Sequence, residues 1–204
     1  MTVKIVTDST SDIPSQIAQA LGITIVPVYV HFGTKTYRDR VDISEDELYQ
    51  KMVEGPVHPT TSTPPPGDFT KVYERLAQES DEIVSIVLTS KESVLYNSAL
   101  LGKEMVRRKC HIEVIDSQSV TVGLGLITIA AAEAAQAGES IDRVVEVARQ
   151  AIPRTHLLGV LDTLKYVLKG GRLGKAAPLL GAIGSMLNVK PMLTIREGEI
   201  KPAG

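Results

Sequence analysis

The sequence predicts an α/β fold: an N-terminal three-layer domain with a mostly parallel sheet, plus the beginning of a second α/β domain. Segments rich in valine and isoleucine alternate with amphipathic segments along residues 1–153, which is typical of βαβ units. Short polar turns follow the apolar segments, at the position where parallel sheets bind ligands. The pattern changes after Pro153, so we expect domains at residues 1–153 and 154–204.

The first elements are a buried strand at Val3–Thr7 and a helix that ends at Gly22. Pro14 stands in the first turn of that helix, where proline is well tolerated, and glycine is the usual residue just past a helix end. Ile23–Val30 is rich in β-branched residues and predicts a second strand. Pro27 lies inside that segment and indicates a sheet edge or a bulge.

The segment from Asp42 to Gly55 carries the clearest local helix signal. Ser44 and Glu47 have the spacing of a capping box, in which each side chain binds the other residue's amide N–H. The proline-rich segment 56–67 predicts a loop. Asp68 then stands where it could cap a helix with apolar residues at positions 69, 72, 73 and 76.

Two further strands and three further helices complete the first domain. We expect the strands at Ile83–Leu88 and Ile112–Ile115. We expect the helices near Val94–Arg108, along the alanine-rich segment that ends at Gly138, and from Ser140 to Pro153.

The remaining segment predicts short elements of a second domain. Strands are expected at Leu157–Leu161 and Val189–Ile195, with a helix at 163–168 between them. Residues 196–199 have the composition of a hairpin turn. The return strand has barely begun at Ile200, so we expect it to lack pairing and the second domain to be truncated.

The composition excludes several classes of protein. The chain has 204 residues, 43% hydrophobic, and a formal net charge of -2, which does not favour nucleic-acid binding. Cys110 is the sole cysteine, so no intramolecular disulfide forms. The N-terminus reaches Asp8 too early for a signal peptide, and no apolar run has the ~20 residues of a membrane helix. We therefore expect a cytoplasmic location.

Catalytic and cofactor motifs are incomplete. The segment 123–128 lacks the third glycine of the dinucleotide fingerprint. Gly170 to Lys175 is one residue short of a phosphate loop, and Ala176 stands where a magnesium-binding hydroxyl belongs. The four histidines never have metal-ligand spacing. We therefore expect no catalytic residue, no metal and no cofactor.

The positive signal is a set of hydroxyl groups in loops that face the predicted ligand edge. Thr61 and Ser62 lie in the proline-rich loop, and Ser93 starts a helix after the third strand. Their alternative roles are structural, as turn residues and a helix cap. A helix start with hydroxyl donors nevertheless suits an anion such as a carboxylate. Arg172, after two glycines, could reach the same anion or remain a solvated turn residue.

These residues resemble the DegV family over the whole chain. The resemblance includes Val-Thr-Asp-Ser-Thr at 6–10, Thr-Ser-x-Pro at 61–64 and Pro-Gly-Asp-Phe at 66–69. It continues with Asp-Ser at 116–117, Lys-Gly-Gly-Arg-Leu at 169–173 and Val-Lys-Pro at 189–191.

The resemblance implies an EDD/DegV-like fold in which a long-chain fatty acid lies between two domains. Several members of the family serve as the acyl-binding subunit of an ATP-dependent fatty acid kinase, which makes acyl phosphate for phospholipid synthesis. By this resemblance, the carboxylate binders are Thr61, Ser62 and Ser93, with Arg172 facing the anion. The chain itself would be non-catalytic. Acyl length, oligomeric state and a transient membrane encounter stay open.

The chain departs from the family in two places. The family usually has Ser-Gly-Thr-Tyr where this chain has Ser93-Val94-Leu95-Tyr96, which adds bulk beside the headgroup. The family also places a histidine near the headgroup some tens of residues further on, and no residue here matches it.

Two alternative functions remain from the sequence. One is a small-molecule hydrolase or phosphoryl-transfer enzyme that uses the loops of Asp8, Ser93 and Asp116. The other is a lipid-independent module that only binds a partner protein.

Overall fold

The computed structural model describes residues 2–163 and 190–203. Its centre is a four-stranded parallel sheet in the order β2-β1-β6-β7. The strands are β1 (Lys4–Asp8), β2 (Ile23–Val26), β6 (Glu82–Val87) and β7 (His111–Asp116). The predicted α/β class with a mostly parallel sheet is therefore confirmed.

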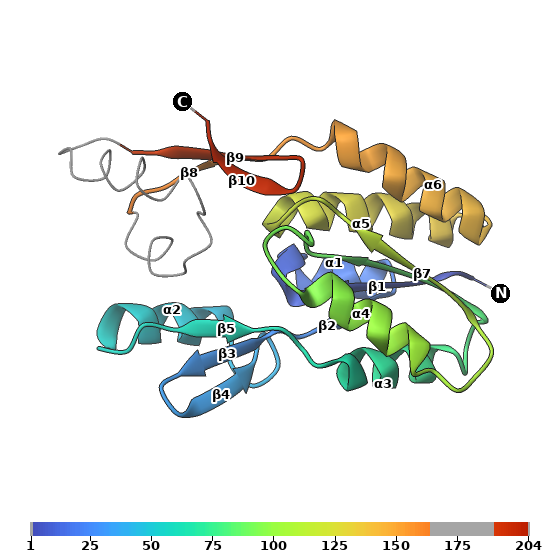
Figure 1. The fold of residues 1–204 in the computed structure, drawn as a ribbon, viewed down its shortest axis with the longest axis horizontal. Helices are drawn as coiled ribbons and strands as arrows, with labels where there is room; N and C mark the ends of the chain where they lie inside the picture. The colour runs from blue at the N-terminus through green and yellow to red at the C-terminus, as the bar shows by residue number, and fades with distance from the viewer. Residues whose placement is uncertain (1, 164–189, 204) are drawn as a thin grey trace.

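Helices cover both faces of this sheet and make the domain three layers thick (Figure 1). One face carries α1 (Ser15–Ala20), α5 (Thr121–Gln136) and α6 (Ile141–Ala151). The other face carries α3 (Pro66–Leu76) and α4 (Leu95–Glu104). Short 3₁₀ turns follow β1 at Ser9–Ser11 and α6 at Ile152–Arg154.

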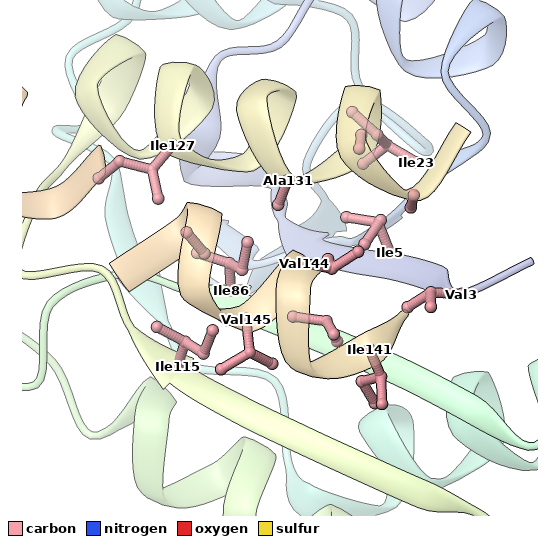
Figure 2. Packing of buried hydrophobic residues seen from close by; sticks show 14 of the residues in the cluster. Val3, Ile5, Ile23, Ile86, Ile115, Ile127, Ala131, Ile141, Val144 and Val145 are labelled. Atoms are coloured by element: carbon pink, nitrogen blue, oxygen red, sulfur yellow. The ribbon is translucent and has the colours of Figure 1, made fainter. Parts of the chain in front are cut away.

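Alternate residues of each parallel strand supply the two halves of the core. Ile5 and Ile86 point toward α5 and α6, where they meet Val144 (Figure 2). Val6 and Val87 belong to the other half, below α3 and α4. Each such buried aliphatic side chain contributes about 1.5–3 kcal/mol of stability, so both faces of the sheet hold the helices firmly.

A small antiparallel sheet in the order β4-β3-β5 extends from this domain. Its strands are β3 (Tyr29–Phe32), β4 (Lys35–Arg38) and β5 (Thr60–Ser62), and α2 (Glu45–Glu54) lies beside it (Figure 1).

The expectation of one strand at 23–30 is wrong, because the segment is divided between two sheets. Pro27 lies at the division, where a residue without an amide hydrogen is tolerated. The expected loop at 56–67 also contains a strand, β5.

The predicted helix caps have different outcomes. The capping box of Ser44 and Glu47 at the start of α2 is confirmed, and Ser140 caps the predicted helix α6. The predicted cap by Asp68 is wrong, because α3 already begins at Pro66 and has no side-chain cap. The Asp68 carboxylate instead accepts a hydrogen bond of 2.7 Å from the hydroxyl of Tyr29.

The C-terminal segment forms a third sheet in the order β10-β9-β8. Its strands are β8 (Leu158–Val160), β9 (Met192–Arg196) and β10 (Glu199–Pro202). The expectation that the return strand lacks pairing is wrong, because all of β10 pairs with β9. The turn between them is Glu197-Gly198, and both have positive φ, at 55° and 80°, as a tight two-residue hairpin requires.

The expected helix at 163–168 and Arg172 fall outside the described residues, apart from Thr163 itself. The division into domains at residue 153 stays a prediction. Within the described part of the chain, no helix has the length and apolar character needed to cross a membrane.

Candidate functional site

The carboxyl ends of all four parallel strands lie at one edge of the domain. The chain leaves β1 toward β2 on one side, while β6 and β7 lie on the other. Such a switch in strand order opens a crevice at the carboxyl ends, where α/β proteins commonly bind ligands. Both smaller sheets extend from this same end of the domain (left in Figure 1).

Asp8, at the end of β1, binds the neighbouring strand rather than facing solvent. Its buried carboxylate accepts the amide N–H of Leu88 at 2.9 Å and the amide N–H of Thr10 at 3.0 Å, together with the Thr10 hydroxyl. Burial raises the pKa of Asp8, and the hydrogen bonds from Thr10 and Leu88 oppose that rise. This carboxylate therefore fixes the spacing of the ends of β1 and β6.

Asp116, at the end of β7, has a similar structural role. Its carboxylate accepts the amide N–H of Gln118 at 2.9 Å, the amide N–H of Ser90 at 3.2 Å and the Ser90 hydroxyl. Both acids of the enzyme hypothesis thus accept backbone hydrogen bonds, from their own turn and from the loop after β6. Within the described residues neither carboxylate has a hydrogen bond to Ser93, so no acid–serine pair is assembled.

A cavity of about 240 Å³ opens at the crevice, and we call it the headgroup pocket. Its walls combine aliphatic side chains with hydroxyl groups, from six separate segments of the chain. The aliphatic residues are Val28, Leu88, Leu95, Val120 and Ile200. The hydroxyl residues are Thr10, Thr61, Ser62, Thr63, Ser93 and Thr121, and the remaining lining residue is Glu92.

Ser93 lies in this pocket and also binds the start of α4. Its hydroxyl oxygen accepts the amide N–H of Leu95 at 3.1 Å, and it lies 3.3 Å from the hydroxyl oxygen of Thr63. An oxygen that accepts from a helix amide still carries a hydrogen that it can donate. The helix-cap role considered for Ser93 is wrong, because the N-cap of α4 is Val94 and has no side-chain cap. The bond from the Leu95 amide is nevertheless compatible with ligand binding.

Thr61 and Ser62 lie on β5, which pairs with the central strand of the small sheet. In the register of that pairing Thr61 is opposite Val30 and Ser62 is opposite Tyr29. Both residues line the headgroup pocket, with Ser62 at the end of the strand. The Ser62 hydroxyl oxygen lies 2.8 Å from the Nε2 atom of His31.

The start of α5 supplies another wall. Thr121 is the first residue of the helix, lines the pocket and has a φ of 46°, which is rare for a β-branched residue. Gly125 allows the helix to lie this close, because a Cβ there would be 2.5 Å from the carbonyl oxygen of Ser11. The amide end of the helix, which favours negative charge, thus borders the pocket.

The C-terminal hairpin closes the pocket from the opposite side. The amide N–H of Ile200 donates to the Glu92 carboxylate at 3.1 Å, and the Thr89 hydroxyl donates to the Gly198 carbonyl at 3.0 Å. Gly198 is required at this contact, because an added Cβ would lie 2.5 Å from the Thr89 hydroxyl oxygen. The residues that form the pocket thus come from both ends of the chain.

Three of the four predicted ligand residues, Thr61, Ser62 and Ser93, line one pocket. Arg172 lies outside the described residues. The sequence did not single out Thr10, Thr63, Thr121 or Glu92 as ligand residues, although all four lie in polar segments beside predicted strands or helices. Among the described side chains, no lysine or arginine lines this pocket, and no cluster could hold a metal ion.

Comparisons with known proteins agree on one family. A family model described as "Uncharacterised protein, DegV family" matches residues 2–204. A DegV domain-containing protein of Caldanaerobacter subterraneus subsp. tengcongensis is 41% identical over 199 residues, which is 98% of this chain and 69% of the relative. One from Deinococcus radiodurans is 36% identical over 204 residues, which is 100% of this chain and 71% of the relative.

Solved structures with the same fold include proteins described as binding fatty acids. A DegV family protein from Thermus thermophilus has a TM-score of 0.88 and 36% identity, over 100% of this chain and 71% of its own. DegV of Bacillus subtilis, described as a fatty acid binding protein, has a TM-score of 0.87 and 30% identity, with the same coverage. A stearic acid-binding protein from Eubacterium ventriosum has a TM-score of 0.84 and 31% identity, over 99% of this chain and 70% of its own. The chain belongs to the DegV family.

Proposed function

We propose that this chain is a non-catalytic carrier that binds a long-chain fatty acid and holds its carboxylate in the headgroup pocket. The main support is the headgroup pocket itself, which has aliphatic walls, several hydroxyl groups and the start of α5 at its border. The fatty-acid-binding DegV proteins of similar fold support the same ligand class.

The chemistry of the pocket favours a carboxylate over a neutral headgroup. The Ser93 hydroxyl oxygen accepts an amide N–H from α4, and this makes the hydroxyl a stronger hydrogen-bond donor to a ligand in the pocket. Hydroxyl donors and a helix start can stabilise an anion without a buried counter-charge. We propose that Thr61, Ser62 and Ser93 bind the carboxylate, with Arg172 facing the same anion.

The acyl tail supplies most of the affinity in this proposal. Each buried CH₂ contributes about 0.8 kcal/mol, so a sixteen-carbon tail offers on the order of 10 kcal/mol before the costs of binding. A hydrogen bond to a charged group adds only about 1.5–3 kcal/mol. At about 240 Å³ the headgroup pocket is smaller than ordinary ligand pockets, so we assign it the head of the lipid and place the tail beyond its walls.

The second step of the proposal is presentation of the bound carboxylate to an ATP-dependent kinase partner, which forms acyl phosphate. Asp8 and Asp116 support a carrier role, because both carboxylates accept backbone hydrogen bonds that hold the loops after the strands. The chain then supplies binding and orientation, and the partner supplies the chemistry.

The test uses palmitate and its methyl ester with wild type, Ser93→Ala and Thr61→Val. Wild type should bind the acid more tightly than the ester, because only the acid carries a charge. Ser93→Ala should reduce acid affinity by about tenfold, the scale of one charge-assisted hydrogen bond, and leave ester affinity nearly unchanged. Isothermal titration calorimetry measures both, and lipid extracted from the purified protein identifies a natural ligand.

Ser140→Ala is a matched control. Ser140 also accepts an amide N–H at a helix start, from Arg143, but it lies outside the headgroup pocket. Ser140→Ala removes a helix N-cap and Ser93→Ala removes a hydrogen bond to the first residue of α4, so both should lose about 1 kcal/mol of stability. Ser140→Ala should bind palmitate like wild type. Equal binding of acid and ester by wild type, or equal acid affinity in the two alanine variants, would refute the headgroup assignment.

A further inference from the structure

His31 stands directly behind one of the hydroxyls of the headgroup pocket. It lies on β3, between β4 and β5, and both of its ring nitrogens have hydroxyl partners. The Nε2 atom is 2.8 Å from the hydroxyl oxygen of Ser62, and the Nδ1 atom is 2.9 Å from that of Thr36. Ser62 in turn lines the pocket, while His31 does not.

The protonation state of an imidazole fixes the direction of such bonds. A neutral ring has one N–H donor and one acceptor nitrogen, so one of its two hydroxyl partners must donate its hydrogen into the ring. A protonated ring donates from both nitrogens, so both hydroxyl oxygens accept and their hydrogens point elsewhere.

We propose that His31 is a positioning residue that controls whether the Ser62 hydroxyl donates to a ligand carboxylate. This inference rests on the proposed function and adds a regulator to the same site. With His31 protonated, Ser62 accepts from the ring and its hydrogen is free for the carboxylate, and a positive charge lies one hydrogen bond behind it. With His31 neutral, the ring accepts one hydrogen, either from Ser62 or from Thr36, so one of its two tautomers holds the Ser62 hydrogen away from the ligand.

In the described part of the chain, the charged side chains on the elements around His31 do not pair with its ring. Arg38 on the adjoining strand and Asp68 on the helix nearby have partners of their own. Arg38 pairs with Asp42 at 2.7 Å, and Tyr29 donates to Asp68, which also pairs with Lys71. Lys35 lies opposite Phe32 in the register of β4, one position from His31. Within the described residues none of these makes an ion pair with the His31 ring, and β5 contributes only hydroxyl side chains.

The test measures binding of palmitate with a ¹³C-labelled carboxyl group between pH 8 and pH 5.5, the interval in which histidine side chains change charge. The variant is His31→Gln, which can still donate a hydrogen bond to Ser62 but does not titrate. The ionisation of free palmitate is the same for both proteins, so the ratio of their affinities isolates the histidine. We expect that ratio to rise about fivefold in favour of wild type as the pH falls, the scale of one net hydrogen bond.

The bound lipid gives a second readout. The carboxyl ¹³C shift of bound palmitate should titrate at lower pH in wild type than in His31→Gln, because a donor and a nearby positive charge stabilise the carboxylate. The methyl ester should show no pH-dependent ratio. His111→Gln is the matched control, since His111 lies at the start of β7 and pairs with Glu113 instead.

The possible results distinguish the role of His31 from the proposed fatty-acid carrier function. If palmitate binds wild type and depends on Ser93, while His31→Gln follows wild type across the pH range, the carrier function stands and the role of His31 is refuted. If wild type binds no palmitate at any pH, both are refuted. A fivefold change in His31→Gln that is absent from His111→Gln supports both.

Discussion

Ser93 and Ser140 each accept an amide N–H at the start of a helix, yet only Ser93 lies in the headgroup pocket. The difference arises from what surrounds each serine, since Thr63 lies beside Ser93 and belongs to a different segment of the chain. Because the hydroxyl oxygen accepts and the hydroxyl hydrogen donates, one serine can stabilise a helix and bind an anion. A variant of each serine is therefore needed to separate the effect on helix stability from the effect on ligand binding.

Sequence order could bring candidate residues together where it carried a local signal, while their role as ligand binders stays a prediction. Thr61, Ser62 and Ser93 follow from polar runs next to predicted strands and helices, and they do line one pocket. His31 gave no such signal, because its partner Ser62 is 31 positions away and is reached only through strand pairing. Contacts made across paired strands depend on register, which one sequence does not reveal.

A first prediction concerns Asp8. In Asp8→Asn one carboxylate oxygen becomes an NH₂ group, so a buried backbone donor loses its acceptor. We expect a loss of about 1–3 kcal/mol in the free energy of unfolding near neutral pH. Asp81→Asn makes the same charge change at an exposed position and should stay within about 0.5 kcal/mol of wild type. Urea unfolding measures both.

The same pair of proteins tests the pH dependence of Asp8. Burial raises its pKa above the ordinary value of 3.8, so the folded state holds the proton more tightly than the unfolded chain. Its contribution to stability is therefore greatest below pH 3.8 and decreases as the pH rises through the folded-state pKa. The stability of wild type relative to Asp8→Asn should fall as the pH rises from 4 toward that value. A constant difference would mean that Asp8 titrates alike in both states.

At the scale of elements, the helices and parallel strands were predictable because each has a local signal. A few consecutive residues are enough to predict these elements. Examples are the capping box of Ser44 and Glu47 and the runs of buried residues in β1 and β6. The small sheet was not predictable in this way. Its strands β4 and β5 have three or four mainly exposed residues with little apolar alternation, so only pairing with β3 defines them.

The placement of α5 gives a second prediction. Gly125→Ala gains helix propensity of about 1 kcal/mol, but its Cβ would lie 2.5 Å from the Ser11 carbonyl oxygen. Overpacking of this kind costs about 1–3 kcal/mol and should also move Thr121 at the start of the helix away from the pocket. We expect a less stable protein with weaker palmitate binding, measured by thermal unfolding and calorimetry.

Gly67→Ala is the corresponding control in α3. An added Cβ at Gly67 meets no atom within 4 Å, so stability and palmitate binding should equal or exceed those of wild type. If Gly125→Ala matches Gly67→Ala in both measurements, the close approach of α5 to Ser11 does not position the pocket.

At the scale of the whole molecule, the headgroup pocket unites segments from residue 10 to residue 200. The parallel sheet fixes the loops after β1, β6 and β7, the small sheet brings β5, and the C-terminal hairpin adds Ile200. Glu92 joins two of these parts, because it lines the pocket and accepts the Ile200 amide N–H. A ligand carboxylate would therefore enter beside the group that holds the hairpin in place.

The last prediction follows from this shared position of Glu92. Glu92→Gln keeps a side-chain oxygen that can accept the Ile200 N–H, but it removes the one negative charge among the described residues of the pocket. Because like charges repel, palmitate should bind about tenfold more tightly to this variant, while its methyl ester should bind as it does to wild type. Hydrogen exchange at the Ile200 amide should remain slow, which shows that the hairpin stays closed. Glu199→Gln changes the net charge equally on β10, outside the pocket, and should leave palmitate affinity unchanged. If Glu92→Gln instead weakens acid and ester binding together and the Ile200 amide exchanges faster, Glu92 acts through closure of the hairpin and its charge does not oppose the ligand.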